Sequence, residues 1–206
     1  MSKTRLLKTI LIGTSGVGKT ALITTFCCEK FTNNYKATIG ADFVTKSMIV
    51  GNKEVSMQIW DTAGNERFVS LSVAFYRGAD CCGLVFDVSN EKSFERLLFW
   101  KDEFLRNACT SLGDDRKYPF VIIGNKTDKP AVITSAMVAE WIVANDVNAV
   151  YIETSASTGV GVDTAFNCLA KKALEHDPGD TLTSQETHIQ PFYDDEDDDD
   201  ERATCC

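Results

Sequence analysis

Eight consecutive residues are the clearest candidate for binding chemistry, and they stand between a short apolar run and a predicted helix. Positions 13–20 read Gly-Thr-Ser-Gly-Val-Gly-Lys-Thr, the pattern of a phosphate-binding loop. Glycines there let backbone N–H groups close around phosphate oxygens, and the start of the helix adds partial positive charge. Lys19 can reach the β- and γ-phosphates of a nucleotide, and Thr20 can bind Mg²⁺. The phosphate-binding residues predicted from this pattern are Ser15, Gly16, Val17, Gly18, Lys19 and Thr20.

A second candidate is the Asp-Thr-Ala-Gly segment at 61–64. An Asp-x-x-Gly pattern alone carries little information, because about half of all chains contain one by chance. This one follows a predicted strand downstream of the phosphate-binding loop, so both motifs should reach the same edge of a sheet. Asp61 can there hold Mg²⁺ through water, and the Gly64 N–H can bond to the γ-phosphate and report its presence.

A third group of residues indicates which base is bound. Asn-Lys-Thr-Asp ends one predicted strand and Thr-Ser-Ala follows another. The Asp128 carboxylate can accept from both N1–H and the 2-amino group of guanine, a pair of donors that adenine lacks, and leaving a buried carboxylate without its partners is costly. The Lys126 stem can lie over the base, Asn125 can tie the loops together, and the Ala156 N–H can meet guanine O6. The guanine-binding residues predicted here are Asn125, Lys126, Asp128, Ser155 and Ala156.

These motifs need a scaffold, and the hydrophobic pattern predicts one. Apolar β-rich segments alternate with helical ones. Strands are predicted at 6–12, 43–49, 55–60, 83–87, 120–124 and 150–153, and helices at 19–28, 94–108, 135–144 and 162–175. Gly51-Asn52 is typical of a hairpin turn, and the other crossovers are long enough to be helical. We therefore expect a three-layer α/β fold, with a six-stranded, mostly parallel sheet, one antiparallel strand and helices on both faces.

Acidic side chains are concentrated in one part of the chain. The 206 residues carry a formal net charge of −9, but residues 177–206 contain 11 acidic side chains and one arginine, so residues 1–176 have a net charge of +1. This predicts one globular domain over 1–176 and a disordered acidic tail over 177–206. The lack of a basic stripe argues against a nucleic-acid partner. No run is apolar and long enough to cross a bilayer, and the first apolar run reads as a strand rather than a signal peptide, so we expect folding in the cytosol.

Over roughly residues 5–176 the sequence resembles the Ras superfamily of small GTPases, and within it the Rab family. Besides the motifs above, Trp-Asp-Thr-Ala-Gly at 60–64 followed by Glu-Arg-Phe at 66–68, and Tyr-Arg-Gly-Ala at 76–79, have the Rab form. More narrowly, residues 35–43, Tyr-Lys-Ala-Thr-Ile-Gly-Ala-Asp-Phe, together with 73–82 and 102–105, are similar to the late-endosomal and lysosomal Rab subfamily.

The resemblance implies a P-loop GTPase fold and a GTP/GDP switch that regulates vesicle traffic to late endosomes, lysosomes or phagosomes. Implied partners are a guanine-nucleotide exchange factor, a GTPase-activating protein, a Rab escort protein, a GDP-dissociation inhibitor, and effectors that bind the switch regions in the GTP state. The implied place is the cytosolic face of those membranes, in exchange with the cytosol.

The resemblance also implies roles for particular residues. Thr38 would contact the γ-phosphate and ligate Mg²⁺, Phe31 would pack against the base, and Ser15 would lie beside the γ-phosphate. The implied catalytic residues are Asn65, Lys19 and Gly64, and the implied metal ligands are Thr20, Thr38 and Asp61. Catalysis of phosphoryl transfer would be mainly positioning and charge neutralisation, with intrinsic turnover on the order of 10⁻⁴ per second.

The sequence departs from the family at three places. Asn65 stands where the family usually has Gln, Ser157 stands where Lys is common, and the tail is acidic. Two other functions compete with a switch. One is a nucleotide-binding scaffold that barely hydrolyses GTP, motivated by Asn65, and the other is a P-loop kinase acting on a small molecule, against which Asp128 in its Asn-Lys-x-Asp context argues. GTP turnover separates the first from a switch, and ATP binding at micromolar concentration would favour the second.

Cys205 and Cys206 form an adjacent pair after the acidic run. The fourth residue from the end is Ala203, so this is not a C-a-a-X box. The pair resembles the Rab signal for double geranylgeranylation, and two lipid chains give stable anchoring where one is marginal. We expect lipidation at Cys205 and Cys206.

Overall fold

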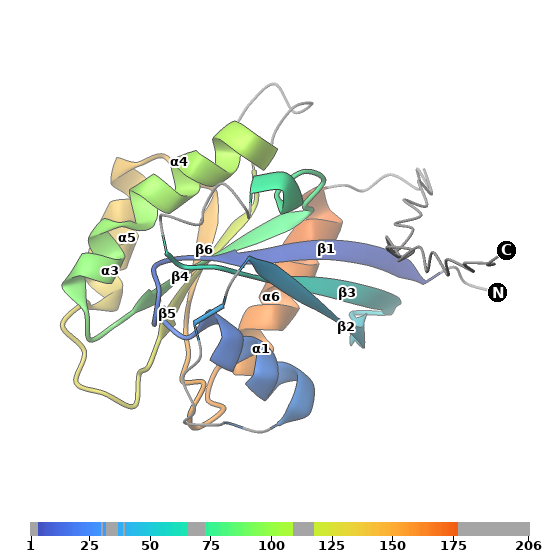
Figure 1. The fold of residues 1–206 in the computed structure, drawn as a ribbon, viewed down its shortest axis with the longest axis horizontal. Helices are drawn as coiled ribbons and strands as arrows, with labels where there is room; N and C mark the ends of the chain where they lie inside the picture. The colour runs from blue at the N-terminus through green and yellow to red at the C-terminus, as the bar shows by residue number, and fades with distance from the viewer. Residues whose placement is uncertain are drawn as a thin grey trace, which may run out of the picture.

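The sheet of this protein contains six strands in the order β2-β3-β1-β4-β5-β6 in the computed structural model (Figure 1). The model describes residues 4–29, 31, 37–38, 40–65, 73–108 and 118–176. The strands are β1 (Arg5–Ile12), β2 (Ala41–Val50), β3 (Lys53–Thr62), β4 (Cys81–Asp87), β5 (Phe120–Asn125) and β6 (Ala149–Glu153). β2 pairs antiparallel with β3 and every other pairing is parallel, which confirms the expected mixed sheet.

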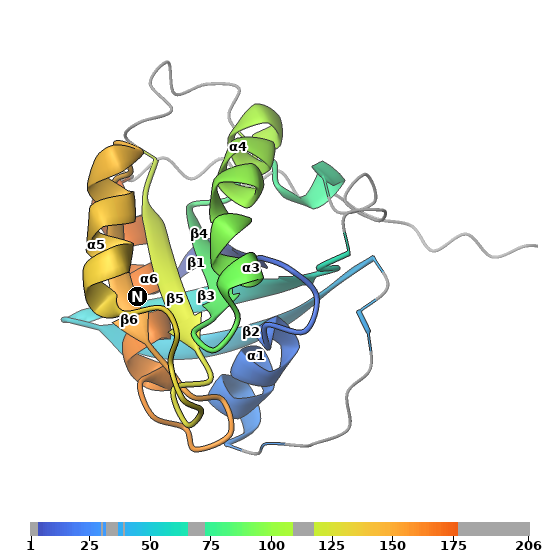
Figure 2. The same cartoon turned by 90° about the vertical axis from the view of Figure 1, so that its left-hand side faces the viewer.

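Helices cover both faces of this sheet (Figures 1 and 2). They are α1 (Lys19–Cys28), α3 (Glu91–Glu95), α4 (Leu97–Ala108), α5 (Ser135–Ala144) and α6 (Val162–His176), with a 3-10 turn η2 (Val73–Phe75). On one face, α1 and α6 build a core in which Phe26 stacks on Phe166, with ring centroids 4.1 Å apart. On the other face, α3, α4 and α5 build a second core around Trp100 and Phe104. The three-layer α/β prediction is therefore confirmed.

The β2–β3 hairpin is longer than its hydrophobic pattern predicted. Cross-strand pairing runs from Ala41 opposite Thr62 to Val50 opposite Lys53, and Gly51 takes a φ of 60° at the turn. The residues added to the predicted strands break the apolar alternation: Asp42, Lys53 and Glu54 are exposed, while Asp61 and Thr62 are polar but buried. Backbone pairing in the hairpin thus continues past the segment that the hydrophobic pattern marks. The longer pairing carries β3 as far as Thr62, at the edge of the phosphate-binding loop.

The single helix predicted at 94–108 is wrong at its start. The structure has two helices, α3 and α4, separated at Arg96. The first turn of α3 is polar and has no hydrophobic period, and it is held instead by hydrogen bonds. The Ser93 hydroxyl donates to the Asn90 carbonyl at 2.7 Å, and the Asn90 N–H donates to the Asp87 carbonyl at 2.9 Å. Neither the side chain–backbone bond nor the backbone turn bond leaves a hydrophobic period in the sequence.

None of the helices in the described ranges combines the length and apolar character needed to span a bilayer. The predicted tail at 177–206 lies outside the described residues.

Candidate functional site

The predicted site residues meet at the carboxyl edge of the sheet. β1 ends directly before Gly13, β3 ends directly before Ala63 and Gly64, β5 ends at Asn125, and β6 ends directly before Thr154. Because parallel strands share one carboxyl edge, segments far apart in the sequence form one set of loops there. This is the usual position of ligands in open α/β sheets.

The phosphate-binding loop needs its glycines for space as well as for backbone angle. Gly13 and Gly18 take φ values of 148° and 102°, which L side chains rarely adopt. A Cβ on Gly13 would lie 2.1 Å from the Val85 carbonyl oxygen, and one on Gly18 would lie 2.4 Å from Asn125 Nδ2. Gly18 is also the N-cap of α1, so the loop leads straight into the start of a helix.

Lys19 lies inside this loop with only 5% of its surface exposed. Its ammonium donates to the Gly13 carbonyl at 2.7 Å and to the Thr14 carbonyl at 3.4 Å. Burial lowers the pKa of Lys19 to about 8, and the nearby Asp61 carboxylate partly opposes that effect. A buried cation held by carbonyls is suited to receive an anion. Gly64 closes this side of the loop, because a Cβ on it would lie 2.5 Å from the Ser15 backbone nitrogen and 2.6 Å from Lys19 Nζ.

The three predicted metal ligands converge. The Thr20 hydroxyl donates to Asp61 Oδ2 at 2.6 Å, the Thr38 hydroxyl donates to the same oxygen at 3.2 Å, and the two hydroxyl oxygens lie 3.0 Å apart. Asp61 is 7% exposed, and burial raises its pKa. Its other oxygen, Oδ1, is buried with no hydrogen-bond partner among the described residues.

This donor set fits Mg²⁺. The ion prefers oxygen ligands, takes one or two carboxylates from the protein, and keeps waters and phosphate oxygens for its remaining positions. One carboxylate with an unpaired oxygen and two hydroxyls match that preference. No group of three or more His, Cys, Asp or Glu side chains suited to a metal occurs within 4–29, 31, 37–38, 40–65, 73–108 and 118–176.

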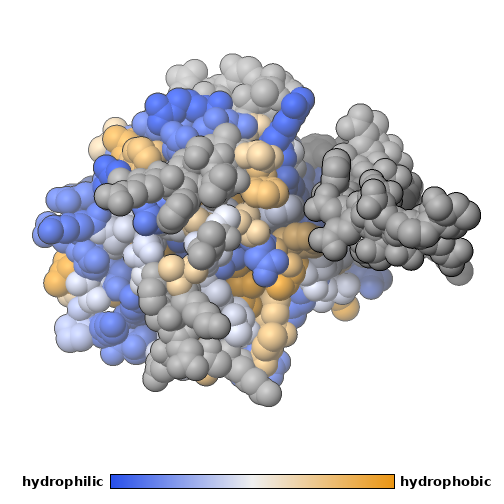
Figure 3. Space-filling view, viewed as in Figure 1, coloured by the Kyte–Doolittle hydropathy of each residue, from blue (hydrophilic) through white to orange (hydrophobic). Residues whose placement is uncertain are grey.

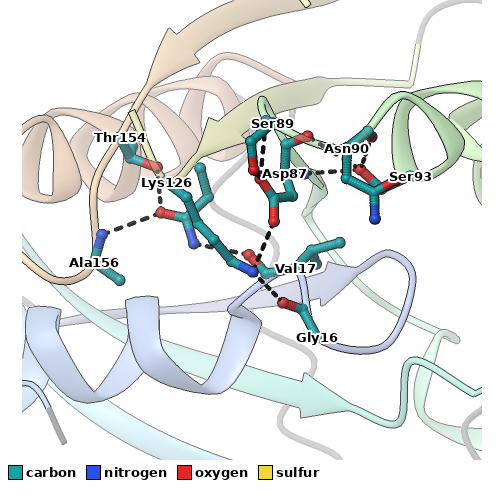
Figure 4. Close-up of polar contacts among 10 residues, drawn as sticks. Gly16, Val17, Asp87, Ser89, Asn90, Ser93, Lys126, Thr154 and Ala156 are labelled. Carbon is teal, nitrogen blue, oxygen red and sulfur yellow. Dashed lines mark hydrogen bonds and ion pairs between the residues drawn. The ribbon is translucent and has the colours of Figure 1, made fainter. Parts of the chain in front are cut away.

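Asn125 ties three loops together (Figure 4). Its amide nitrogen donates to the Val17 carbonyl at 2.8 Å. Its amide oxygen accepts from the Thr154 hydroxyl at 3.2 Å and from the Ala156 N–H at 3.1 Å. The tying role predicted for Asn125 is therefore visible in the geometry, and the Ala156 N–H assigned to guanine O6 is bonded to Asn125 in this structure.

The Asp128 carboxylate is prepared by neighbouring hydroxyls. Ser155 Oγ donates to Asp128 Oδ1 at 2.6 Å, and the Ser155 and Ser157 hydroxyl oxygens lie 3.0 Å apart. The hydrogen bond from Ser155 lowers the pKa of Asp128, so the side chain is an acceptor at neutral pH. Ser157, where the family commonly has Lys, thus adds a second hydroxyl that helps to lower the pKa of Asp128.

Lys126 has a partner that the motifs did not reveal. Its ammonium lies 2.7 Å from Asp87 Oδ2 and donates to the Gly16 carbonyl at 2.6 Å, as Figure 4 shows. Asp87 was missed because a lone Asp belongs to no pattern. Its position as the last residue of the buried strand β4, at the same edge of the sheet as Asp61 one residue before the end of β3, was the one signal that could have indicated it.

The structure gives less information about the remaining predicted residues. Phe31 is 41% exposed, and positions 30 and 32–36 beside it lie outside the described residues. Asn65 is exposed, directly after Gly64 and before the undescribed segment 66–72. Cys205 and Cys206 lie outside the described residues.

Comparison with known proteins agrees with this geometry. The model of the Ras family matches residues 8–175. The chain is 49% identical to Ras-related protein RABG3c of Arabidopsis thaliana over 205 residues, 98% of this chain and 96% of that protein. It is 50% identical to Ras-related protein Rab7 of Prunus armeniaca over 186 residues, 88% of each chain, and 50% identical to GTP-binding protein yptV5 of Volvox carteri over 183 residues, 87% of this chain and 88% of that protein. The match to the family model over most of the chain and the high identity to Rab proteins along nearly its whole length together show that this chain belongs to the Ras family, in the Rab branch of small GTPases that act as GTP-hydrolysing switches in vesicle traffic.

Proposed function

We propose that this GTPase binds GTP or GDP with Mg²⁺ across the loops at the carboxyl edge of the sheet, and that Thr38 and Gly64 respond to the γ-phosphate. The observation that carries this proposal is the convergence of the Thr20 and Thr38 hydroxyls on one buried carboxylate, Asp61. Two of these side chains come from the fixed phosphate-binding loop and strand β3. The third, Thr38, comes from a segment that only the resemblance had assigned to the site.

The chain's own groups supply positioning and charge. Lys19 would place its ammonium on the β- and γ-phosphates in exchange for the Gly13 and Thr14 carbonyls. Backbone N–H groups from Ser15 to Thr20 would surround the phosphate oxygens. Thr20, Thr38 and, through water, Asp61 would hold Mg²⁺, and the bound ion would neutralise phosphate charge. Loss of the γ-phosphate on hydrolysis would remove what holds Thr38 and Gly64, and the two switch segments would be released.

The base site would be read mainly by Asp128. Its carboxylate would accept from guanine N1–H and the 2-amino group, supported by Ser155 and Ser157. The Lys126 stem and the Phe31 ring would cover the base on its faces. The Ala156 N–H would reach guanine O6 by sharing or exchanging its bond to Asn125.

The partner-binding surface would include an aromatic stack beside the nucleotide loops. Trp60 lies between Phe43 and Phe75, with ring centroids 4.9 Å and 4.8 Å away. In Figure 3, hydrophobic side chains gather on the central part of the face, in the region where β2 and β3 run in Figure 1. Exposed apolar residues on β2 are Phe43, Val44 and Ile49. Effectors would read the GTP state here, next to Thr38 and Gly64.

The remaining assignments follow from membership of the Rab branch. An exchange factor and an activating protein would set the GTP and GDP states, and an escort protein and a GDP-dissociation inhibitor would handle a lipidated form. Lipids on Cys205 and Cys206 would hold the protein on the cytosolic face of late-endosomal, lysosomal or phagosomal membranes.

The test uses Thr20→Asn, with Thr24→Asn one turn further along α1 as its matched control. Thr24 bonds to the Thr20 carbonyl through its hydroxyl and takes no part in the proposed metal site. We expect Thr20→Asn to lose Mg²⁺-dependent GTP affinity and to favour GDP or the empty protein, while Thr24→Asn behaves like wild type. Titration with a fluorescent GTP analogue, with Mg²⁺ and with EDTA, measures this. GTP binding by Thr20→Asn that still depends on Mg²⁺ as in wild type would show that the metal site is misplaced.

A further inference from the structure

Asp87, the last residue of β4, is bonded through both oxygens of its carboxylate. Oδ2 lies 2.7 Å from Lys126 Nζ. Oδ1 accepts from the Ser89 backbone N–H at 2.9 Å and from the Ser89 hydroxyl at 2.6 Å. The residue is only 6% exposed. Burial acts to raise its pKa, but the bonds from Lys126 and Ser89 outweigh burial and leave the pKa below its ordinary value.

Lys126 is held in an unusual way by these contacts. Its backbone takes a φ of 68°, a left-handed conformation that is uncommon for residues other than glycine. Its ammonium donates to the Gly16 carbonyl at 2.6 Å as well as facing Asp87. The tip of the side chain is therefore fixed between strand β4 and the phosphate-binding loop, and the direction of the aliphatic stem follows from where the tip is held.

The two oxygens of Asp87 belong to separate contacts. Oδ1 and the Asp87 backbone join the loop that leads into α3, where the Asp87 N–H donates to the Ser93 hydroxyl at 3.0 Å. Oδ2 faces Lys126 and thus the base loop. A second link joins the same two segments, since the Val88 N–H donates to the Asn125 carbonyl at 3.0 Å. Figure 4 shows the carboxylate lying between these two sides.

We propose that Asp87 is a positioning residue for guanine-nucleotide binding. Its carboxylate holds the Lys126 ammonium beside the Gly16 carbonyl, keeps the lysine stem over the base and so slows nucleotide release. This inference rests on the proposed function, because it takes Lys126 as part of the base site. A charge-assisted hydrogen bond to a buried carboxylate is stronger than a bond between neutral groups, and without it the ammonium keeps only a carbonyl and water.

The experiment measures release of a fluorescent GDP analogue from Mg²⁺-loaded protein into excess unlabelled GDP. Asp87→Asn keeps the side-chain shape and removes the charge that faces Lys126, and we expect release to become about tenfold faster. Ser89→Ala is the matched control, because it removes a bond to the other oxygen, and we expect a change within about twofold. In a Lys126→Met background, Asp87→Asn should change release by less than about twofold, because the group it acts through is gone.

Two results would overturn the proposal. One is nucleotide release from Asp87→Asn at a rate within twofold of wild type. The other is a release rate of the Asp87→Asn/Lys126→Met double variant that equals the two single effects multiplied together. A purely structural role for Asp87 gives the second result. If Lys126→Met holds too little nucleotide to measure, the side-chain ammonium resonance of Lys126 in ¹⁵N-lysine-labelled, GDP-bound protein decides instead. It should be seen in wild type and Ser89→Ala and be lost in Asp87→Asn, and its persistence in Asp87→Asn refutes the proposal. Failure of wild type to bind GDP would refute the proposed function itself.

Discussion

In the proposed function, the choice of base rests on a single side chain, Asp128. Ser155 donates to its Oδ1 at 2.6 Å and lowers its pKa, so the carboxylate is ionised and turned by the protein before any ligand arrives. An ionised acceptor matches the two adjacent donors on guanine. Adenine offers no such pair, and xanthine has an oxygen in place of the 2-amino group.

Asp128→Asn should therefore weaken GDP and GTP binding by between about tenfold and a hundredfold, because one acceptor becomes a donor. Binding of xanthine nucleotides should improve, since their C2 oxygen can accept from the new amide. Calorimetry with GDP and with xanthosine diphosphate measures both changes. Asp163→Asn, at an exposed position in the first turn of α6 that is not assigned to the base, is the control and should leave both affinities as in wild type. Unchanged guanine affinity in Asp128→Asn would remove Asp128 from the base site.

Asn65 is a position where a substitution is expected to raise the rate of GTP hydrolysis. Its amide can orient an attacking water as a Gln would, but it is one methylene shorter, about 1.5 Å of reach. Where catalysis is positioning, a displacement of that size costs up to about a hundredfold. We expect Asn65→Gln to hydrolyse bound GTP faster than wild type in single-turnover assays without an activating protein.

The control for this change is Asn52→Gln in the β2–β3 turn, which adds the same methylene far from the phosphates and should not alter the rate. An Asn65→Gln rate equal to or below that of wild type would mean that the backbone around residue 65 already compensates for the shorter side chain. Measurable turnover in wild type also separates a switch from a scaffold that only holds GTP.

Residues of the site were predictable where the motif spacing reports chemistry. Lys19 belongs to the motif that follows β1, while Asp61 and Asn125 belong to motifs at the carboxyl ends of β3 and β5, and the structure places all three at one edge of the sheet. Asp87 was not predictable, because its pairing with Lys126 joins two segments through folding alone. Thr38 came only from resemblance to a family, since a lone Thr in a polar segment has no recognisable pattern.

At the scale of elements, the site depends on how closely the phosphate-binding loop approaches β5. Asn125, the last residue of β5, donates to the Val17 carbonyl, and Gly18 lies so near that an added Cβ would be 2.4 Å from Asn125 Nδ2. The Trp100 indole on α4 donates to the Thr14 hydroxyl at 3.1 Å from the other side of the sheet. The phosphate-binding loop is thus held by the sheet, through Asn125, and by the helical layer that contains α4.

Gly18→Ala should disrupt this contact. The new methyl group would displace the Asn125 side chain, and alanine at position 18 would have to adopt a φ of 102°. We therefore expect loss of bound nucleotide and a fall of about 2–3 kcal/mol in the free energy of unfolding. Gly51→Ala is a matched control, because its φ is 60° and nothing lies within 4 Å of an added Cβ. The control should lose only the backbone contribution, about 1–2 kcal/mol, and keep its nucleotide.

Nucleotide content after purification and thermal unfolding measure both variants. Equal behaviour of Gly18→Ala and Gly51→Ala would mean that backbone strain alone explains the effect and that the approach of the loop to Asn125 is unimportant.

Helices and strands could be predicted where the burial of one face makes apolar residues recur at a regular spacing. α6, whose buried residues recur at helical spacing, matches its predicted bounds to within one residue. α1 and α5 have their predicted bounds because flanking residues mark their starts, with Gly18 as the N-cap of α1 and the Thr134 side chain capping α5. α3 was merged with α4 because Asn90, Ser93 and Asp87 hold its first turn by polar bonds, which hydrophobic periodicity cannot detect. The polar ends of β2 and β3 were missed for a related reason, since cross-strand pairing extends beyond the half-buried segment.

At the scale of the whole molecule, charge is divided between two parts of the chain. Residues 1–176 are nearly neutral, with a net charge of +1, while residues 177–206 carry −10. An anionic membrane surface attracts basic segments by about 1 kcal/mol per charge and repels acidic ones. Direct attraction between the acidic run and the membrane surface cannot therefore hold this protein there, and any attachment has to come from lipids or from a partner.

Cys205→Ser combined with Cys206→Ser should abolish membrane attachment in cell fractionation, while nucleotide binding stays intact. The reason is that the double variant has neither of the proposed lipid-bearing cysteines, and electrostatics opposes attachment here. Cys27→Ser with Cys28→Ser is the matched control, because this second adjacent pair lies at the end of α1 with Cys28 exposed, and it should leave attachment unchanged. If the Cys205/Cys206 double variant still pellets with membranes, a protein partner holds the molecule there, and the acidic run, which membranes repel, becomes the first segment to test for that contact.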